Sequence, residues 1–216
     1  MSSGIQSRTA LTSATWTNIY SGPSAGRASV ITVNFTNRSS STGTIYLALS
    51  TSSSSPGNSE YLLYAVNVNP YSPYEIKNIV VGYGYYLLAY ASGTFSVQAY
   101  GIDDVTDNYT VTGRFGAADL AATTNTSIAS GPASGRMQTA TVQITNRNNS
   151  IVTVNLAITS SPTSPSASDY IEYNVALPAY GTLTRTGIVL ANGQGIGVYS
   201  SAAGVNAVCW GIDNLA

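Results

Sequence analysis

Hydrophobic and polar side chains alternate with a period of two along most of the 216 residues. Ile31, Val33 and Phe35 alternate with Thr and Asn residues, and the stretches 45–49 (IYLAL) and 95–99 (FSVQA) follow the same pattern. A period of two places successive side chains on opposite faces of a β-sheet, so that one face is buried. Gly, Pro, Asn and Ser separate about seven such runs in each half of the chain, and we find no convincing helical period. The pattern predicts an all-β protein.

The chain also contains an internal duplication. The sequence SGPSAGR at 21–27 recurs as SGPASGR at 130–136, an offset of 109 residues. A repeat that covers nearly the whole chain indicates two copies of one supersecondary unit. We therefore predict two tandem antiparallel β-sandwich modules, Ig-like or jelly-roll-like, at residues 1–106 and 107–216. Further segments recur with the same offset, or with one residue more near the C-terminus: TNR (36–38 and 145–147), SEY and SDY (59–61 and 168–170), and GID (101–103 and 211–213).

The composition is poor in charge. Charged residues make up 8% of the chain, against about 25% in an average protein, and the net charge is −1. Hydroxyl and amide groups, which cost less to desolvate than ions, must therefore solvate the surface. Such a surface suits a subunit of a packed assembly, although an ordinary all-β domain with Ser/Thr-rich strands is the alternative.

Several classes of function lack the residues that they need. The eight basic residues are scattered, which argues against nucleic-acid binding. Histidine is absent and Cys209 is the single cysteine, so we expect no catalytic activity, no metal, no cofactor and no intrachain disulfide, with Cys209 a small buried hydrophobic residue. No apolar run reaches about 20 residues, and the first twenty residues resemble no Sec-type signal peptide. We expect no membrane partner.

Four arginines occur at predicted turns in both copies. We interpret them as structural clamps that pair with the acids recurring in both copies, with ligand binding as the alternative. The arginines are Arg27, Arg38, Arg136 and Arg147, and the expected acidic partners are Glu60, Asp169, Asp103 and Asp213.

Tyrosine is distributed unequally between the two copies. Of sixteen tyrosines, eleven precede residue 104. Those with a tyrosine counterpart in the second copy are predicted to be framework residues, and Trp16 and Trp210 core or corner residues. The unmatched tyrosines face Ala, Asn, Gln or Gly, so most should point outward and form a protein-contact surface, since exposed tyrosines are enriched in interfaces. Scattered aromatics without a role are the alternative. The residues predicted to form this surface are Tyr20, Tyr46, Tyr83, Tyr85 and Tyr86.

The second copy carries further segments that resemble a known class of proteins. Its SGPxxGR turn and strand ending in TNR are followed by DYIEY (169–173), LTRTGIVL (183–190) and VCWGID (208–213). These resemble β-sandwich modules of tailed-bacteriophage virion proteins, found among capsid decoration (cement) proteins and tail- or fibre-associated proteins. In the first copy, YEIKN at 74–78 replaces the LTRTG segment.

The resemblance implies a non-enzymatic component of the virion, assembled in the host cytoplasm. A capsid decoration protein that reinforces the outer shell is the leading expectation, with the major capsid protein or other virion subunits as partners and a homo-oligomer in the virion. The alternatives are a tail- or fibre-associated protein and a carbohydrate-binding module for host adhesion, for which the YGYY segment at 83–86 could supply stacking rings.

Overall fold

The computed structural model describes residues 3–106 and 112–215, except for the side chains of 3, 103–106 and 215. These residues are almost entirely β-strand, as the alternation predicted, and their single helical turn is the 3₁₀ turn η1 (Ala167–Asp169). The chain divides into two compact units. Unit 1 comprises Met1–Gly57 and Leu63–Gly113, and unit 2 comprises Asn58–Leu62 and Arg114–Ala216. A short piece of the first sequence copy thus belongs to the second structural unit.

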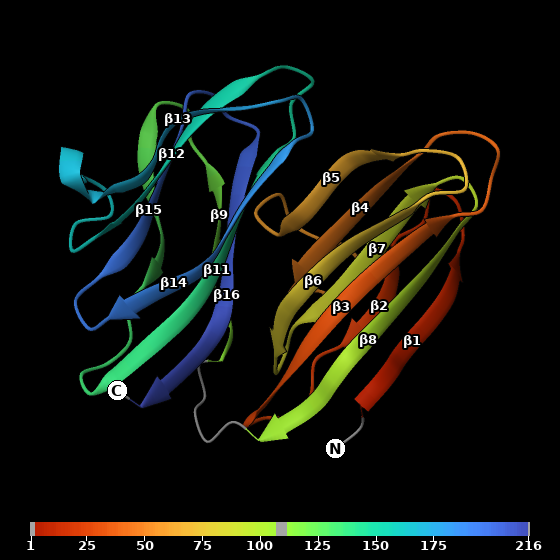
Figure 1. Ribbon diagram of the computed structural model, residues 1–216, viewed down its shortest axis with the longest axis horizontal. Helices are drawn as coiled ribbons and strands as arrows, with labels where there is room; N and C mark the ends of the chain where they lie inside the picture. The colour runs from red at the N-terminus through yellow and green to blue at the C-terminus, as the bar shows by residue number, and fades with distance from the viewer. Residues whose placement is uncertain (1–2, 107–111, 216) are drawn as a thin grey trace. The chain divides into compact units, whose positions relative to one another are not determined.

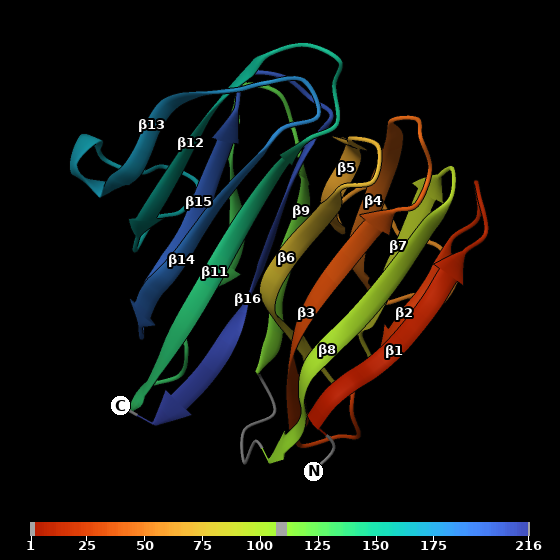
Figure 2. The same cartoon turned by 45° about the vertical axis from the view of Figure 1, so that its right-hand side comes forward.

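Eight strands form two four-stranded antiparallel sheets in unit 1, in the orders β1-β8-β3-β6 and β2-β7-β4-β5 (Figure 1). In Figure 2 the first of these sheets faces the viewer. The strands are β1 (Ser3–Leu11), β2 (Thr17–Ser21), β3 (Arg27–Asn37), β4 (Gly43–Ser50), β5 (Tyr61–Val68), β6 (Pro73–Gly82), β7 (Tyr86–Ser92) and β8 (Phe95–Thr106).

Unit 2 repeats this strand order: its sheets run β9-β16-β11-β14 and β10-β15-β12-β13. An eight-stranded double sheet of this connectivity is the jelly roll, which decides between the two predicted topologies, since an Ig-type sandwich has a different order. The strands are β9 (Gly113–Leu120), β10 (Thr124–Ser130), β11 (Arg136–Asn146), β12 (Val152–Thr159), β13 (Tyr170–Leu177), β14 (Thr182–Ala191), β15 (Gly195–Ser200) and β16 (Val205–Leu215).

The hydrophobic positions of the alternating runs form the cores. In β3 the side chains of Ile31, Val33 and Phe35 are fully buried, and in β16 Val205, Ala207 and Cys209 are buried in the same way. Burial of the Cys209 thiol raises its pKa to about 12, because desolvation disfavours the thiolate. The prediction of Cys209 as a small buried residue is confirmed.

The recurring SGPxxGR sequence is explained by two glycine positions. At Gly22 an added Cβ would lie 2.1 Å from a backbone oxygen, and at its counterpart Gly131 it would lie 2.3 Å from one. Gly26 and Gly135 have φ of 79° and 80°, in the left-handed region that favours glycine. Both requirements are structural, so the repetition of this sequence reports the fold.

The recurring Asn of the TNR sequence has a structural role as well. Asn37 is buried at the end of β3, where its Nδ2 donates to the backbone oxygens of Ser41 (2.8 Å), Val68 (3.1 Å) and Asn69 (3.2 Å), and its Oδ1 accepts from the Ser39 amide (3.0 Å). Asn146 makes the equivalent contacts in unit 2. One side chain thus holds two loops together in each unit.

Candidate functional site

An aromatic cluster lies on the outer face of the unit 1 sheet that contains β4 and β7. Tyr46 and Tyr90 are directly opposite each other in these two strands. Tyr64 in β5 and Trp16, immediately before β2, extend the cluster on either side. The two neighbours of Tyr46 in β4 are fully buried in the core, which places Tyr46 on the outer face. We call these four residues the aromatic stripe.

The rings of the aromatic stripe hold one another in place. The ring centroid of Tyr46 lies 5.0 Å from those of Tyr64 and Tyr90 and 6.2 Å from that of Trp16, in edge-to-face geometry each time. Trp16 and Tyr90 are 5.4 Å apart and tilted by 46°. Each such pair contributes about 0.5–1.5 kcal/mol beyond its buried area. All four rings are partly exposed, so the stripe presents ordered aromatic surface that loses little entropy on binding.

Unit 2 lacks two of the four rings of the stripe, whereas Tyr64 and Tyr90 keep the tyrosine counterparts Tyr173 and Tyr199. The positions of Trp16 and Tyr46 are taken there by Asn125 and Asn155. Asn155 contributes to the backbone structure, because its Oδ1 accepts a hydrogen bond from the Asn174 amide (2.6 Å). The aromatic stripe is thus a feature of one copy only.

Two of the predicted contact residues, Tyr46 and Tyr20, point in different directions. Tyr46 belongs to the aromatic stripe. Tyr20 does not face outward with it: the Tyr20 hydroxyl donates to Oγ of Ser29 (2.7 Å), a fully buried residue of β3 in the opposite sheet. Comparison of the two copies could not reveal this, because the Ala that replaces Tyr20 in the second copy fits a buried position and an exposed one equally well.

The other three predicted tyrosines lie at the turn between β6 and β7. Tyr83 is 65% exposed there, and Tyr85 and Tyr86 are partly buried. Tyr86 is opposite Ser50, four residues along β4 from Tyr46, so the two tyrosines are roughly 13 Å apart along the strand. Of the five predicted residues, Tyr46 is the one that belongs to the aromatic stripe.

The remaining members of the stripe were predicted to have other roles. Tyr64 and Tyr90 have tyrosine counterparts and were interpreted as framework, and Trp16 was interpreted as a core or corner residue. The outer position of Tyr90 follows from the β4–β7 register, which sequence alternation alone does not fix, and ring contacts with Tyr46 place Tyr64 and Trp16 beside it. The other tryptophan, Trp210, is buried, in agreement with the prediction.

The predicted arginine clamps have mixed partners. Arg136 donates from Nε to Oδ1 of Asp213 (2.6 Å), and Gln138 donates to the other oxygen of that carboxylate (3.4 Å). Arg147 instead pairs with Asp119, an acid that the sequence analysis had not considered. Arg38 is exposed.

Three further residues complete the set of predicted clamps. Arg27 begins β3, and the side chain of Asp103 lies outside the described residues. Asp169 was predicted to pair with arginine, but its Oδ2 accepts from the Ser166 amide (2.7 Å) and forms a capping box at η1.

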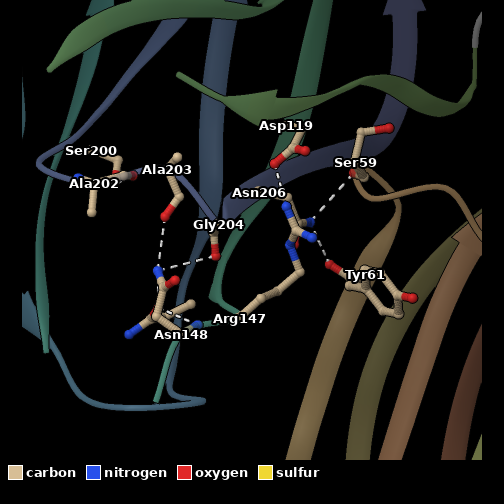
Figure 3. A network of polar contacts seen from close by, with 11 residues as sticks. Ser59, Tyr61, Asp119, Arg147, Asn148, Ser200, Ala202, Ala203, Gly204 and Asn206 are labelled. Carbon is tan, nitrogen blue, oxygen red and sulfur yellow. Dashed lines mark hydrogen bonds and ion pairs between the residues drawn. The ribbon is translucent and has the colours of Figure 1, made fainter. Parts of the chain in front are cut away.

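A second candidate site is the segment Asn58–Leu62, which packs against unit 2 and is called the 58–62 segment below (Figure 3). Its backbone carbonyls accept hydrogen bonds from β16: Nδ2 of Asn206 donates to the oxygens of Tyr61 (2.8 Å) and Ser59 (3.3 Å). Asn206 is fully buried.

Side chains of β11 bind the end of the same segment. Gln143 donates through Nε2 to the Leu62 oxygen, and Oγ1 of Thr145 also donates to it (3.1 Å). Gln143 and Thr145 alternate with the core residues of β11, so they are on the outer face of its sheet, yet they are almost completely buried. The 58–62 segment therefore binds an outer sheet face through side-chain-to-backbone hydrogen bonds.

Charged groups surround the 58–62 segment. Glu60, which is 6% exposed, forms an ion pair with Arg114 at 2.9 Å. The guanidinium of Arg147 lies over the ring of Tyr61, 6.0 Å from its centroid, while it pairs with Asp119 (Figure 3). Glu60 had been expected to pair with one of the recurring arginines, and Arg114 is not one of them.

No protein-family model matches the chain, and no curated protein matches it. Within residues 3–106 and 112–215 no three metal-ligating side chains come together, and no helix is long and apolar enough to cross a membrane. Among the described residues, the aromatic stripe of unit 1 is the exposed candidate surface, whereas the outer sheet face of unit 2 is already covered by the 58–62 segment.

Proposed function

We propose that this protein is a non-enzymatic structural component of a tailed-bacteriophage virion, a decoration protein that attaches to the outer capsid shell. The major capsid protein or another virion subunit is its partner, and the aromatic stripe is its attachment surface. The observation that carries the proposal is the presence of the stripe on one of two duplicated units. Two of its four outward rings, Trp16 and Tyr46, are replaced by asparagine in unit 2, and these added rings are explained by a contact that only unit 1 makes.

The stripe has the properties of an interface centre. Tyr and Trp are enriched among the residues that dominate binding energy, especially where their side chains are already ordered. The surrounding surface is rich in hydroxyl groups and poor in charge, and therefore costs little to desolvate. Many copies on a shell would add up modest contacts through multivalency.

The fold and the resemblance support the same class. Jelly rolls occur in viral capsid and lectin domains, which is an analogy at the level of fold. The resemblance of the second copy to phage virion modules is independent of that analogy, because it depends on the SGPxxGR, DYIEY and VCWGID segments.

Co-sedimentation with capsid shells tests the proposal. Shells of the phage that encodes the chain, prepared without it, are mixed with labelled protein and pelleted. We expect Tyr46→Ser to weaken binding at least about tenfold, whereas Tyr83→Ser, an exposed tyrosine outside the stripe, leaves it unchanged. Tyr46→Phe, which keeps the ring, should retain most of the binding.

Two results would contradict the capsid assignment. One is wild-type protein that stays in the supernatant at all shell concentrations. The other is recovery of the chain by mass spectrometry only in the tail fraction of separated virions, which would support the tail- or fibre-associated alternative.

A carbohydrate-binding role is the second candidate, and the partly exposed Trp16 ring beside Tyr90 favours it. Sugar rings stack on such surfaces and take hydrogen bonds from nearby amides, which the exposed Asn18 at the end of the stripe could provide. A glycan array probed with the full chain and with Trp16→Ala distinguishes this role. Signals that disappear in the variant would support it, and an array without signals would exclude it.

A further inference from the structure

The two surfaces that meet in the contact of the 58–62 segment each have a counterpart elsewhere in the same chain. The internal duplication supplies a counterpart of the segment at residues 167–171 and a counterpart of the face that binds it on β3 and β8. We propose that the 167–171 segment of one copy of the chain binds the outer face of β3 and β8 in a second copy. The proposal does not depend on the proposed function.

The face on β3 and β8 keeps the hydrogen-bonding chemistry of its counterpart. Asn34, Thr36 and Ser96 occupy the positions of Gln143, Thr145 and Asn206. Each carries an amide or hydroxyl group that can donate to a backbone carbonyl. In unit 2 the three residues are buried beneath the 58–62 segment, whereas Asn34, Thr36 and Ser96 are partly exposed.

The arginine of the contact is also kept. Arg147 lies over the Tyr61 ring, and its counterpart Arg38 is exposed beside the end of β3. The counterpart of Tyr61 is Tyr170, so the cation–π contact can form again between two copies.

The binding segment of the second copy is exposed in the way that an unoccupied interface would be. Ile171, the counterpart of the completely buried Leu62, is 44% exposed. The capping box between Ser166 and Asp169 orders the turn before it, so little chain entropy is lost on binding.

One part of the contact is not repeated. The ion pair of Glu60 with Arg114 has no equivalent, because Ile5 stands at the position of Arg114. The face on β3 and β8 also has a neighbouring carboxylate, Glu75, opposite Asn34. It accepts a hydrogen bond from Tyr100 and forms an ion pair with Lys77 at 2.9 Å. The contact between copies should therefore be weaker than the one within unit 2, and reversible.

A contact that joins two different surfaces of identical copies is heterologous, so it continues into rings or open chains. This property gives a sharp test by sedimentation velocity. The wild-type chain should form oligomers whose size rises with concentration. Ile171→Lys places a charge in the binding segment, and Thr36→Arg places a large charged side chain on the face of β3 and β8. Each should weaken self-association at least about tenfold.

A mixture of the two variants tests the pairing itself. The Ile171→Lys chain still has an intact face, and the Thr36→Arg chain still has an intact segment, so an equimolar mixture should form dimers and nothing larger. Ile151→Lys is the matched control, because Ile151 is 69% exposed and lies in the loop before β12, outside the 167–171 segment.

Each outcome decides the question. A wild-type chain that remains monomeric up to millimolar concentration overturns the proposal, as does self-association that Ile171→Lys and Ile151→Lys reduce equally. Variants that fail to dimerise when mixed, although hydrogen exchange shows both to be folded, would overturn the pairing of these two surfaces.

Discussion

Replacement of Asn146 by alanine should strongly destabilise unit 2. Asn146 is fully buried, and its Nδ2 donates to the backbone oxygens of Ser150 (2.8 Å), Leu177 (3.2 Å) and Pro178 (2.8 Å). Its Oδ1 accepts from the Asn148 amide (2.9 Å). Alanine leaves all four backbone groups without these partners, and two loops lose their connection.

The magnitude follows from the count of hydrogen bonds. Each contributes about 0.5–1.5 kcal/mol net, so the loss of four lowers the free energy of unfolding by roughly 2–6 kcal/mol. A domain has about 5–15 kcal/mol in total. With a urea slope of about 2 kcal/mol per molar, the midpoint should fall by roughly 1–3 M.

Hydrogen exchange of the full chain at increasing urea concentrations measures the effect separately in each unit. Asn146→Ala should lower the protection of β11, β12 and β16, and Asn37→Ala should lower that of β3, β4 and β8 by a similar amount, because the two networks are equivalent. Asn149→Ala, an exposed asparagine in the same loop, is the control. A loss below about 1 kcal/mol in Asn146→Ala would refute the reasoning.

Three further predictions test other parts of the fold. Arg114→Met removes the ion pair of the buried Glu60 and should lower the unfolding free energy by about 3–5 kcal/mol in urea titration, and the double variant with Glu60→Leu should recover most of the loss. The thiol of Cys209 has a pKa of about 12 in the folded state, above the ordinary value of 9.0, so it loses its proton more readily when unfolded. The free energy of unfolding should therefore be constant with respect to this group below pH 9 and fall by about 1.4 kcal/mol per pH unit as pH rises toward 12. Cys209→Ala should lack this slope. Gly131→Ala should lower the melting temperature clearly more than Gly135→Ala, because its Cβ would lie 2.3 Å from the Ala191 oxygen, whereas Gly135 has open space and only an unfavourable φ; equal shifts would contradict this.

Alternation and duplication predicted the strands that carry the cores, because burial of every second residue is visible in the sequence. The order of strands in each sheet could not be predicted, since it depends on pairings between distant segments such as β1 with β8. The alternation indicated about seven runs in each half, whereas each unit has eight strands, and the sequence of β1, SGIQSRTAL, has no hydrophobic alternation. It pairs through its backbone, which any sequence of compatible conformation can do.

The candidate surfaces were harder to predict. The comparison of the two copies found Tyr46 because its counterpart Asn155 is polar, but it could not find Tyr64 or Tyr90, whose counterparts are also tyrosines. Tyr173, the counterpart of Tyr64, is itself 68% exposed, so a tyrosine kept in both copies need not be a framework residue. In this chain Tyr90 contributes to the aromatic stripe because its neighbours there are Tyr46 and Trp16.

The 58–62 segment shows that residues shared by both copies can also lie in a contact surface. The sequence analysis assumed that residues shared by both copies report the fold. SEY and SDY are shared, yet Glu60 and Tyr61 bind a sheet face of unit 2, and their counterparts Asp169 and Tyr170 have no such face within their own unit. Shared residues can therefore also report a binding surface that one copy uses within the chain and the other leaves open. In a duplicated protein, an internal contact between a segment of one repeat and a face of the next is itself a template for contact between chains.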